Sequence, residues 1–388
     1  MTTAGERYEL PEELRMARTM VKDYVHNEIL PLEQSLDHDA IDMPKEDYDR
    51  LVPKTREMGL WCVGVPQEHG GAGLSLFSQA VIQEEMVQHR AGLYSPVYGT
   101  MGSPPPEIIW IGTDHQIETY GLPTMRGERK GWFAITEPSG GSDVASMQTR
   151  ARPDGDHYVI NGSKTFITGG MTSDFFVVGA RTGGDGLAGI SLFFVETDTA
   201  GFSRSALDRK MGWWCSDQAT LYFDDLRVPA ENLMGEQDLG FIAIMENFNL
   251  ERVALIAGAL GMMRVCLAES IDWAQSRQTF GKPLIRHQVI RHKIADMSAR
   301  IDALEAYLNQ ICWIVNSGEM PVAEICKAKF FATRALAFCA NEAIQILGGA
   351  GYLRGNPVER IYREVKVMAI GGGSEEIMRD LAVRQMGL

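Results

Sequence analysis

The sequence contains little cysteine, and its cysteines are not arranged for chemistry. The 388 residues include 6 cysteines, without a CxxC pair and without a histidine at the spacing of a metal ligand. A disulfide framework or a zinc site is therefore not expected, and we predict no metal site. We interpret these residues as small core side chains: Cys62, Cys215, Cys266, Cys312, Cys326 and Cys339.

Positive charge and long apolar stretches are also scarce. The formal net charge is -14, so the chain has no basic surplus with which to neutralise nucleic-acid phosphates. The first seven residues show neither an apolar signal region nor an Arg-rich leader, and no uninterrupted apolar run approaches a bilayer span. We expect a soluble, cytoplasmic protein that binds no nucleic acid and does not insert into a membrane.

What the sequence does have is a change of hydrophobic periodicity along its length. With 45% hydrophobic residues, the chain can bury a large core in two or three structural units. Apolar residues recur at helical steps in segments 11–35 and 74–91, whereas the prolines of segments 95–96 and 103–106 predict irregular backbone. Strand-like runs with Gly- and Asp-rich turns fill the region from 131 to 238.

After Gly240 the periodicity becomes helical again. Long helices are predicted over about 240–276, 285–316, 321–347 and 357–386. The chain is thus predicted to be α+β and mostly α. Its expected units are an N-terminal helical domain (1–130), a middle β-barrel-like domain (131–238) and a C-terminal four-helix bundle (239–388).

A Gly/Ser-rich loop, Thr136 to Asp143, is the most informative local motif. Tyr158–Ile160 and Lys164–Ile167 flank Asn161-Gly162, which predicts a hairpin that returns Thr168 toward Ser142. Small residues let backbone N–H groups approach a ligand, and nearby hydroxyls add short donors. These features together favour a flavin site, although most isolated loops of this kind are only turns.

Four motifs in register resemble the acyl-CoA dehydrogenase family over essentially the whole length. They are the TEPxxGSD loop, the FITGG strand, Arg277–Lys282 (RQTFGK) and Gln345–Gly349 (QILGG). The resemblance implies an α–β–α architecture with FAD between the β domain and the bundle. It also implies dehydrogenation of an acyl-CoA thioester to the trans-2-enoyl-CoA, with the β-hydride passing to flavin N5 and electrons to an electron-transferring flavoprotein.

Such chemistry needs a carboxylate that removes the α-proton. Many members carry it near the C-terminus, where this chain has Gly372. Isovaleryl-CoA and long-chain members carry it immediately before an arginine on the first bundle helix, which corresponds to Glu251 before Arg252. The apolar surroundings of Glu251 are expected to raise its pKa toward neutrality, whereas a glutamate on an arbitrary amphipathic helix is usually at the surface. We predict Glu251 as the base and the Gly372 N–H as a donor to the thioester oxygen.

Two other glutamates could compete for this role. Glu375 and Glu376 follow Ser374, which suggests an N-cap with acidic first-turn residues whose ionised form the helix dipole stabilises. Stabilised anions are poor bases, so we interpret both as cap residues. The resemblance places Ser374 and Glu376 near FAD.

The resemblance also assigns the remaining site residues. The flavin ring and pyrophosphate are expected to contact Phe133, Ile135, Thr136, Gly141, Ser142, Phe166, Ile167 and Thr168. Contacts with FAD across a subunit interface, and hence a homotetramer built as a dimer of dimers, are expected of Arg277, Phe280, Gln288, Gln345, Ile346, Leu347, Gly348 and Gly349. The acyl-CoA is expected to contact Ser142, Asn249, Arg252, Tyr94, Tyr98 and Gly373.

Two aspects stay open in the sequence. No arginine lies near Tyr94, which disfavours a dicarboxylyl substrate, but isovaleryl-like and long-chain acyl groups are both compatible with Glu251. The same fold also hosts flavin monooxygenases, which gives a second hypothesis for the function. A non-catalytic flavin-binding scaffold is a third hypothesis. Glu251 favours the dehydrogenase, since the monooxygenases typically lack a glutamate in that place.

Overall fold

The N-terminal part of the protein is helical. The computed structural model describes residues 10–94 and 107–388, so the proline-rich segment predicted to be irregular lies outside the described residues. The predicted helix 11–35 is confirmed as a continuous rod with a π-helical turn in its middle, and α4 is shorter than the predicted 74–91. The elements are α1 (Glu12–Tyr24), η1 (Val25–Ile29), α2 (Leu30–Ser35), α3 (Lys45–Glu57), η2 (Gln67–His69) and α4 (Leu76–Met86).

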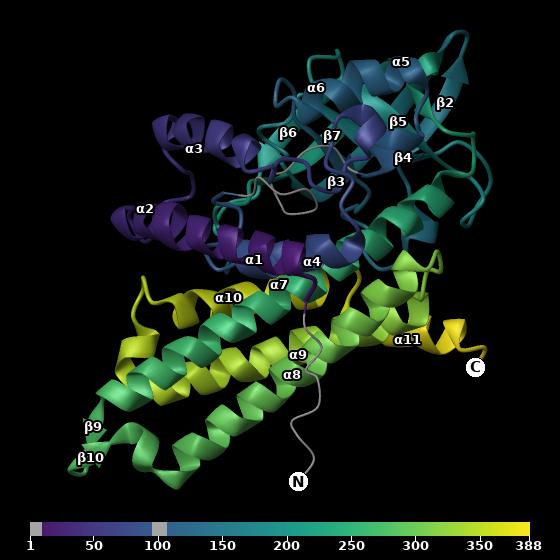
Figure 1. The fold of residues 1–388 in the computed structure, drawn as a ribbon. Helices are drawn as coiled ribbons and strands as arrows, with labels where there is room; N and C mark the ends of the chain where they lie inside the picture. Colours follow the sequence, from purple (N-terminus) through teal and green to yellow (C-terminus); the bar gives the residue numbers. More distant parts are fainter. Residues whose placement is uncertain (1–9, 95–106) are drawn as a thin grey trace.

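A short helical connection leads into the β domain, where eight strands form one sheet (Figure 1). The connection comprises η3 (Glu107–Ile111), α5 (Asp114–Gln116), η4 (Ile117–Gly121) and α6 (Leu122–Met125). The sheet order is β6-β7-β3-β2-β4-β5-β8, with β1 pairing parallel to β4. The strands are β1 (Gly131–Ala134), β2 (Arg150–Asp154), β3 (His157–Thr168), β4 (Phe175–Arg181), β5 (Ile190–Glu196), β6 (Phe202–Ala206), β7 (Gln218–Pro229) and β8 (Leu233–Met234).

The predicted hairpin around Asn161-Gly162 is wrong, because those residues lie inside the single strand β3. The turn occurs earlier, where Asp154 pairs with His157 around Gly155. Gly162 serves another purpose: a Cβ on it would lie 2.5 Å from the hydroxyl of Thr149, the residue just before β2. Asn161 exchanges hydrogen bonds with Asp225 at a register shift, so its amide satisfies a strand irregularity rather than a turn.

The C-terminal part is a bundle of long helices that lies below the sheet in Figure 1. The predicted helix 357–386 is wrong in one respect, because the chain breaks at Gly371–Ser374 into two helices. Gly372 and Gly373 there have φ of 67° and 102°, which a helix cannot accommodate. The helices are α7 (Gly240–Ser276), α8 (Gln288–Asn316), α9 (Val322–Leu347), α10 (Pro357–Ile370) and α11 (Glu375–Gln385).

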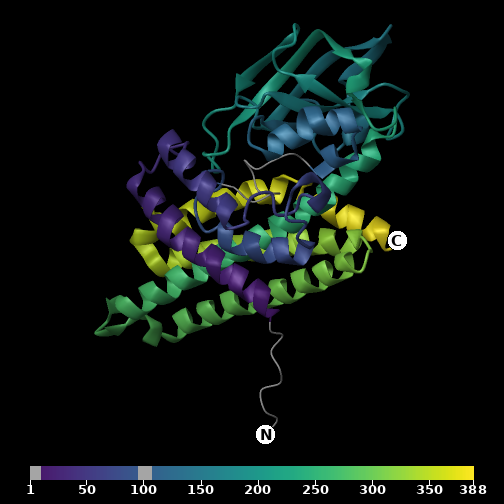
Figure 2. The same ribbon diagram turned by 45° about the horizontal axis from the view of Figure 1, so that its top comes forward.

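Helix α7 is the element that positions the candidate site. Near its start, Ile244 packs in the sheet cluster with Leu192 and Phe194, whereas Val253 and Ile256 belong to the core of the bundle. Helix α4 crosses α7 closely, since a Cβ on Gly261 would lie 2.2 Å from the Glu84 carbonyl oxygen. The segment of α7 from Ile244 to Ile256 therefore lies where the sheet, the bundle and the N-terminal helices meet (Figure 2).

The expectation that no stretch approaches a bilayer span needs correction for this helix. By length and composition α7 could cross a membrane, with a mean hydropathy of 1.6 in its most apolar window. However, 56% of that window is buried inside the protein, and the core helix of a soluble protein passes the same test. Its hydropathy is thus a weak argument for a membrane span.

Candidate active site

Glu251 lies on α7 as a half-buried residue, with Asn249 and Arg252 of the same helix buried beside it. Burial raises the pKa of this carboxyl to about 7, although the Asn247 hydrogen bond and the Arg252 charge oppose the shift. The Asn247 amide donates to Oε1 at 2.7 Å from one helical turn earlier. A carboxyl group with a pKa near neutrality is suited to act as a general base. A hydrogen bond that holds the carboxyl group in one orientation makes it better suited.

The loop after α10 lies against the same face of α7. Leu255, one turn beyond Glu251, places its Cδ1 3.1 Å from where a Cβ on Gly372 would stand. Since residues four apart share a helix face, Glu251 and the Gly372 backbone lie on one side of α7. The structure thus places the loop that carries the predicted backbone donor against the helix that carries the predicted base, and their roles stay a prediction.

Arg252 and Asn249 hold this loop from the α7 side. The Arg252 side chain donates from Nε to the Gly372 carbonyl at 2.9 Å and from Nη1 to the Asn249 amide oxygen at 2.8 Å. Both residues are buried, with exposures of 3% and 6%. Their predicted contact with the substrate stays a prediction, while their contacts within the protein fix the Gly372 backbone against the base helix.

The two rival glutamates are unsuited to accept a proton. Glu375 accepts hydrogen bonds from Thr333, Arg334 and Arg379, and although burial raises its pKa, these partners hold the pKa below its ordinary value. The Glu376 side chain is 80% exposed. Ser374 accepts a hydrogen bond from the Ile377 N–H, which makes it the N-cap of α11 as predicted.

A buried ion pair that the sequence analysis did not identify supports the Gly/Ser-rich loop. Lys164, which is fully buried, donates to Glu137 at 2.8 Å and to the Ile135 carbonyl at 3.0 Å. Glu137 also accepts the N–H groups of Gln148 and Thr149. Burial lowers the pKa of Lys164 to about 8. A lysine facing inward from a strand was the one sequence feature that could have revealed this pair.

The surface around this loop fits a flavin. Phe166 has φ of 57° and is 65% exposed, while Gly141 and Ser142 present exposed backbone. Phe133, Thr136 and Thr168 are partly exposed, and the Thr136 carbonyl accepts the Thr165 N–H at 2.8 Å. An exposed apolar ring beside an exposed Gly-Ser turn suits a flat ring with polar edges and a pyrophosphate.

Ile135 and Ile167 belong to this set only through their backbones. Their side chains are 6% and 3% exposed and pack into the cores of the sheet. The loop adjoins the base helix, because the Phe133 ring meets Phe248 edge-on with 6.1 Å between centroids. Phe248 precedes Glu251 by one turn, so the candidate flavin surface and the candidate base are neighbours.

The second predicted FAD group lies elsewhere. Phe280, which is 96% exposed, Arg277 and Gln288 sit around the β9 (Gln278–Thr279) and β10 (Lys282–Pro283) hairpin. Both views place that hairpin at the end of the bundle away from the sheet (Figures 1 and 2). At the end of α9, Gln345, Gly348 and Gly349 are exposed, whereas Ile346 and Leu347 are buried.

The predicted acyl-pocket residues are only partly described. Tyr98 lies outside the described residues. Tyr94 is 1% exposed and its hydroxyl contacts the hydroxyls of Thr55 and Tyr24, so it is part of the N-terminal core. Gly373 lies in the loop beside Gly372, and a Cβ on it would meet Met378 at 2.5 Å.

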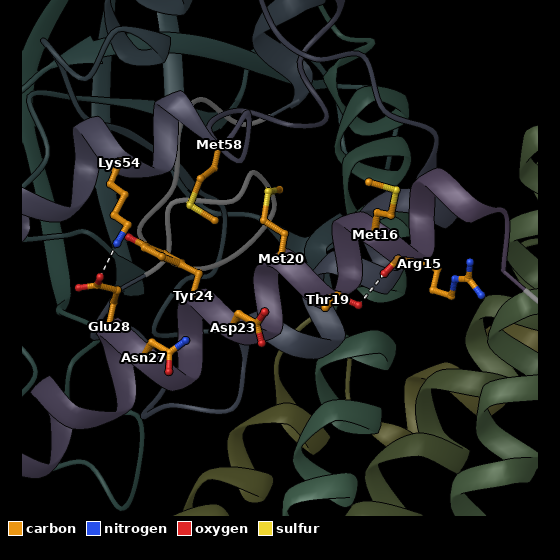
Figure 3. A pocket seen from close by; sticks show the side chains of 10 residues that line it. All are labelled: Arg15, Met16, Thr19, Met20, Asp23, Tyr24, Asn27, Glu28, Lys54 and Met58. Atoms are coloured by element: carbon orange, nitrogen blue, oxygen red, sulfur yellow. Dashed lines mark hydrogen bonds and ion pairs between the residues drawn. The ribbon is translucent and has the colours of Figure 1, made fainter.

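Tyr24 also lines a surface cavity of about 630 Å³ between α1 and α3 (Figure 3). Met16, Met20 and Met58 provide apolar lining, and the Lys54–Glu28 ion pair lies at one side. None of the predicted catalytic or flavin residues lines it. The cavity is therefore separate from the group formed by Glu251, Gly372 and the flavin surface.

Comparison with known proteins identifies the family of the whole chain. Family models for the N-terminal, middle and C-terminal domains of acyl-CoA dehydrogenase match residues 11–128, 132–226 and 238–387. The chain belongs to the acyl-CoA dehydrogenase family. It is thus an oxidoreductase with the predicted α+β fold, and its family is flavin-dependent. The predicted divisions before 131 and before 239 fall just ahead of β1 and α7.

Relatives extend over nearly the whole enzyme. The chain is 35% identical to an acyl-CoA dehydrogenase of Bacillus subtilis, covering 95% of this chain and 96% of that protein. It is 33% identical to a 3-(aryl)acrylate reductase of Clostridium sporogenes, with coverages of 95% and 97%. Butyryl-CoA dehydrogenase from Megasphaera elsdenii is 30% identical with a TM-score of 0.89, covering 98% of this chain and 100% of that one.

Two further solved relatives bear on cofactor and partner. A chain from a structure of the electron-transferring flavoprotein of Acidaminococcus fermentans is 31% identical, with a TM-score of 0.87 and coverages of 98% and 99%. A glutaryl-CoA dehydrogenase from Mycobacterium smegmatis, in complex with FADH2, is 26% identical, with a TM-score of 0.87 and coverages of 97% and 95%.

Proposed function

We propose that this enzyme oxidises an acyl-CoA thioester to its trans-2-enoyl-CoA and that Glu251 removes the α-proton. The observation that carries the proposal is the Glu251 carboxyl group, which burial brings to a pKa of about 7 on the helix face that meets Gly372. A carboxylate in such a place can take a proton from a weak carbon acid and keep it away from solvent.

The protein groups around the base have distinct tasks in this proposal. The α-proton moves to the Glu251 carboxylate, while Asn247 keeps that carboxylate oriented. The Gly372 N–H donates to the thioester oxygen, which gains negative charge as the α-proton leaves. Bound FAD supplies the two-electron acceptor for the β-hydrogen, which leaves with its bonding pair, so that a carbon–carbon double bond forms.

The flavin is held as FAD by two surfaces in this proposal. Phe133, Thr136, Gly141, Ser142, Phe166 and Thr168, with the backbones of Ile135 and Ile167, provide one of them. The β9–β10 hairpin and the end of α9 provide the other, and they lie at the far end of the bundle (Figure 1). Two such distant surfaces meet on one FAD only if a second copy of the chain contributes, which supports association of at least two chains, and we propose that the full assembly is a homotetramer.

The proposed electron acceptor is an electron-transferring flavoprotein. The similarity to a chain from the Acidaminococcus fermentans structure of that protein supports this partner, and the relatives named for acyl-CoA oxidation support the substrate class. We also propose a soluble, cytoplasmic location, which fractionation of cells that express the full chain would test.

Anaerobic bleaching of the bound flavin tests the proposed reaction. The purified yellow protein is mixed with straight, branched and cyclic acyl-CoAs in the absence of oxygen and of NAD(P)H. We expect at least one acyl-CoA to bleach the flavin, and the best substrate names the acyl class. If none bleaches it, while supplied reduced flavin and oxygen support turnover, the enzyme is a monooxygenase of this fold and the proposal is wrong.

A further inference from the structure

Lys329 on α9 is a buried cation without a carboxylate hydrogen-bond partner in the described part of the chain. It is 1% exposed, and its ammonium donates to the Gly373 carbonyl at 2.5 Å. Burial and the nearby Arg252 lower its pKa to about 8, so the fold accommodates this charge at a cost. A lysine in such a place suggests a purpose beyond packing.

Lys329 and Arg252 each donate a hydrogen bond to the carbonyl of one of two successive peptide groups. Arg252, from α7, binds the Gly372 carbonyl, and Lys329, from α9, binds the Gly373 carbonyl. A trans peptide points its N–H away from its C=O, and the described chain contains no cis peptide bond. The N–H groups of Gly373 and Ser374 therefore point away from the two cations.

These N–H groups remain available to a ligand. Within the described residues, the N–H groups of Gly372, Gly373 and Ser374 donate to no protein acceptor. Gly372 and Gly373 have positive φ, and because glycine lacks a Cβ, this loop could adopt many other backbone conformations. The two buried cations restrict these alternatives, because they fix the peptides that carry the Gly373 and Ser374 N–H groups and thereby the place of the loop that carries the Gly372 N–H.

We propose that Lys329 is a positioning residue that, together with Arg252, fixes the two peptide groups that follow the Gly372 N–H and so keeps this N–H directed at the substrate's thioester oxygen. The inference rests on the proposed function, because it assigns the same loop to the same oxygen. Lys329 itself touches no reacting atom. Its contribution is transmitted through the Gly373 peptide, since without the ammonium this carbonyl loses its anchor and the loop can turn its donors away.

Substitution of Lys329 by Met tests the inference, with Lys327→Met as the matched control. Lys327 lies on the same helix, but it is about one-third exposed and pairs with Glu324. For an acyl-CoA that bleaches the wild-type flavin, we expect Lys329→Met to lower the limiting bleaching rate about 10-fold or more. The half-saturating concentration and the flavin content should stay near wild type, and Lys329→Arg should restore most of the rate.

A binding measurement separates positioning from loss of structure. Calorimetry compares the affinity for the enoyl-CoA thioester with that for the matching thioether, which lacks the carbonyl oxygen. The wild type should prefer the thioester, and Lys329→Met should lose most of that preference while its affinity for the thioether is unchanged. Lys327→Met should behave as the wild type in both experiments.

Two results would overturn the inference while leaving the proposed function intact. In one, Lys329→Met keeps the wild-type bleaching rate and thioester preference. In the other, Lys329→Met and Lys329→Arg both lose flavin and fold, which makes the lysine a stability element only. If no acyl-CoA bleaches the wild type, the proposed function fails first, and the inference fails with it.

Discussion

At the scale of single residues, Glu251 illustrates how a fold changes the chemistry of a side chain. The sequence around it is apolar, but it is the packing of α7 against the cores of the sheet and the bundle that partly desolvates the carboxyl group. Desolvation disfavours the charged form, which is why the pKa rises from its ordinary value of 4.5 to about 7. Glu375, with three donors on its oxygens, shifts in the opposite direction.

This pKa predicts a pH dependence of the reaction. A protonated Glu251 cannot accept the α-proton, so the second-order rate constant for flavin bleaching should rise with pH and reach half its plateau near pH 7. Below that pH, we expect a fall of about tenfold per pH unit, because one proton abolishes the base. Stopped-flow bleaching between pH 5 and 9 measures this profile. A rate that is flat between pH 5 and 7 would be incompatible with a base of this pKa.

At the scale of elements, the long helices and most strands could be predicted, but the details that shape the site could not. Periodicity located α7, α8 and α9 within a few residues, since an amphipathic pattern repeats over many turns. The Asn161-Gly162 pair wrongly predicted a turn. Gly162 is required because Thr149, just before β2, lies too close for a side chain, and local sequence does not encode this contact. The break at Gly371–Ser374 likewise interrupts an otherwise helical pattern.

The candidate site likewise contains residues that the sequence could predict and residues that it could not. Glu251, Gly372 and the flavin loop were predicted because a family motif marks each of them in the sequence. Lys164 and Lys329 were not, since their partners Glu137 and Gly373 lie 27 and 44 residues away and only the tertiary fold brings them together. Buried polar support of this kind is decided by long-range packing rather than by local pattern.

The Lys164–Glu137 pair yields a prediction for the flavin loop. Lys164→Met leaves the buried Glu137 carboxylate without its cation, which should lower the free energy of unfolding by about 3–5 kcal/mol and weaken flavin retention. Denaturant unfolding and flavin release measure the two effects. Arg227→Ala, which removes a half-exposed ion pair with Asp154, is the control and should change stability little.

Adding Glu137→Gln to Lys164→Met should recover part of the lost stability, because the unpaired charge is then gone. The account of this loop would be contradicted if Lys164→Met unfolded and retained flavin as the wild type does.

At the scale of the whole molecule, one chain carries two surfaces for what we propose is a single cofactor. The loop beside Phe133 adjoins the base helix, whereas the β9–β10 hairpin lies at the opposite end of the bundle (Figure 2). The Phe280 ring at the tip of that hairpin is 96% exposed, so it is free to contact a cofactor bound by another copy. Both observations support a site completed by a second copy.

Phe280→Ala tests this view of the molecule. We expect the variant to fold with an unchanged unfolding midpoint, because the ring packs on little of its own chain, but to bind FAD about tenfold more weakly through the partner copy. Equilibrium binding of FAD to the apoprotein measures the affinity. Leu187→Ala, at an exposed leucine between β4 and β5, serves as the control. Unchanged FAD affinity in Phe280→Ala would argue that the hairpin does not reach the cofactor.

The most direct test of the account is anaerobic flavin bleaching by the best acyl-CoA in Glu251→Gln, compared with Glu246→Gln. Glu246 lies on the same helix but is exposed, so its substitution removes a carboxylate without touching the candidate base. We predict that Glu251→Gln binds flavin and acyl-CoA but bleaches at least about 1,000-fold more slowly, while Glu246→Gln matches the wild type. Equal bleaching in Glu251→Gln and the wild type would contradict the central claim that Glu251 is the base.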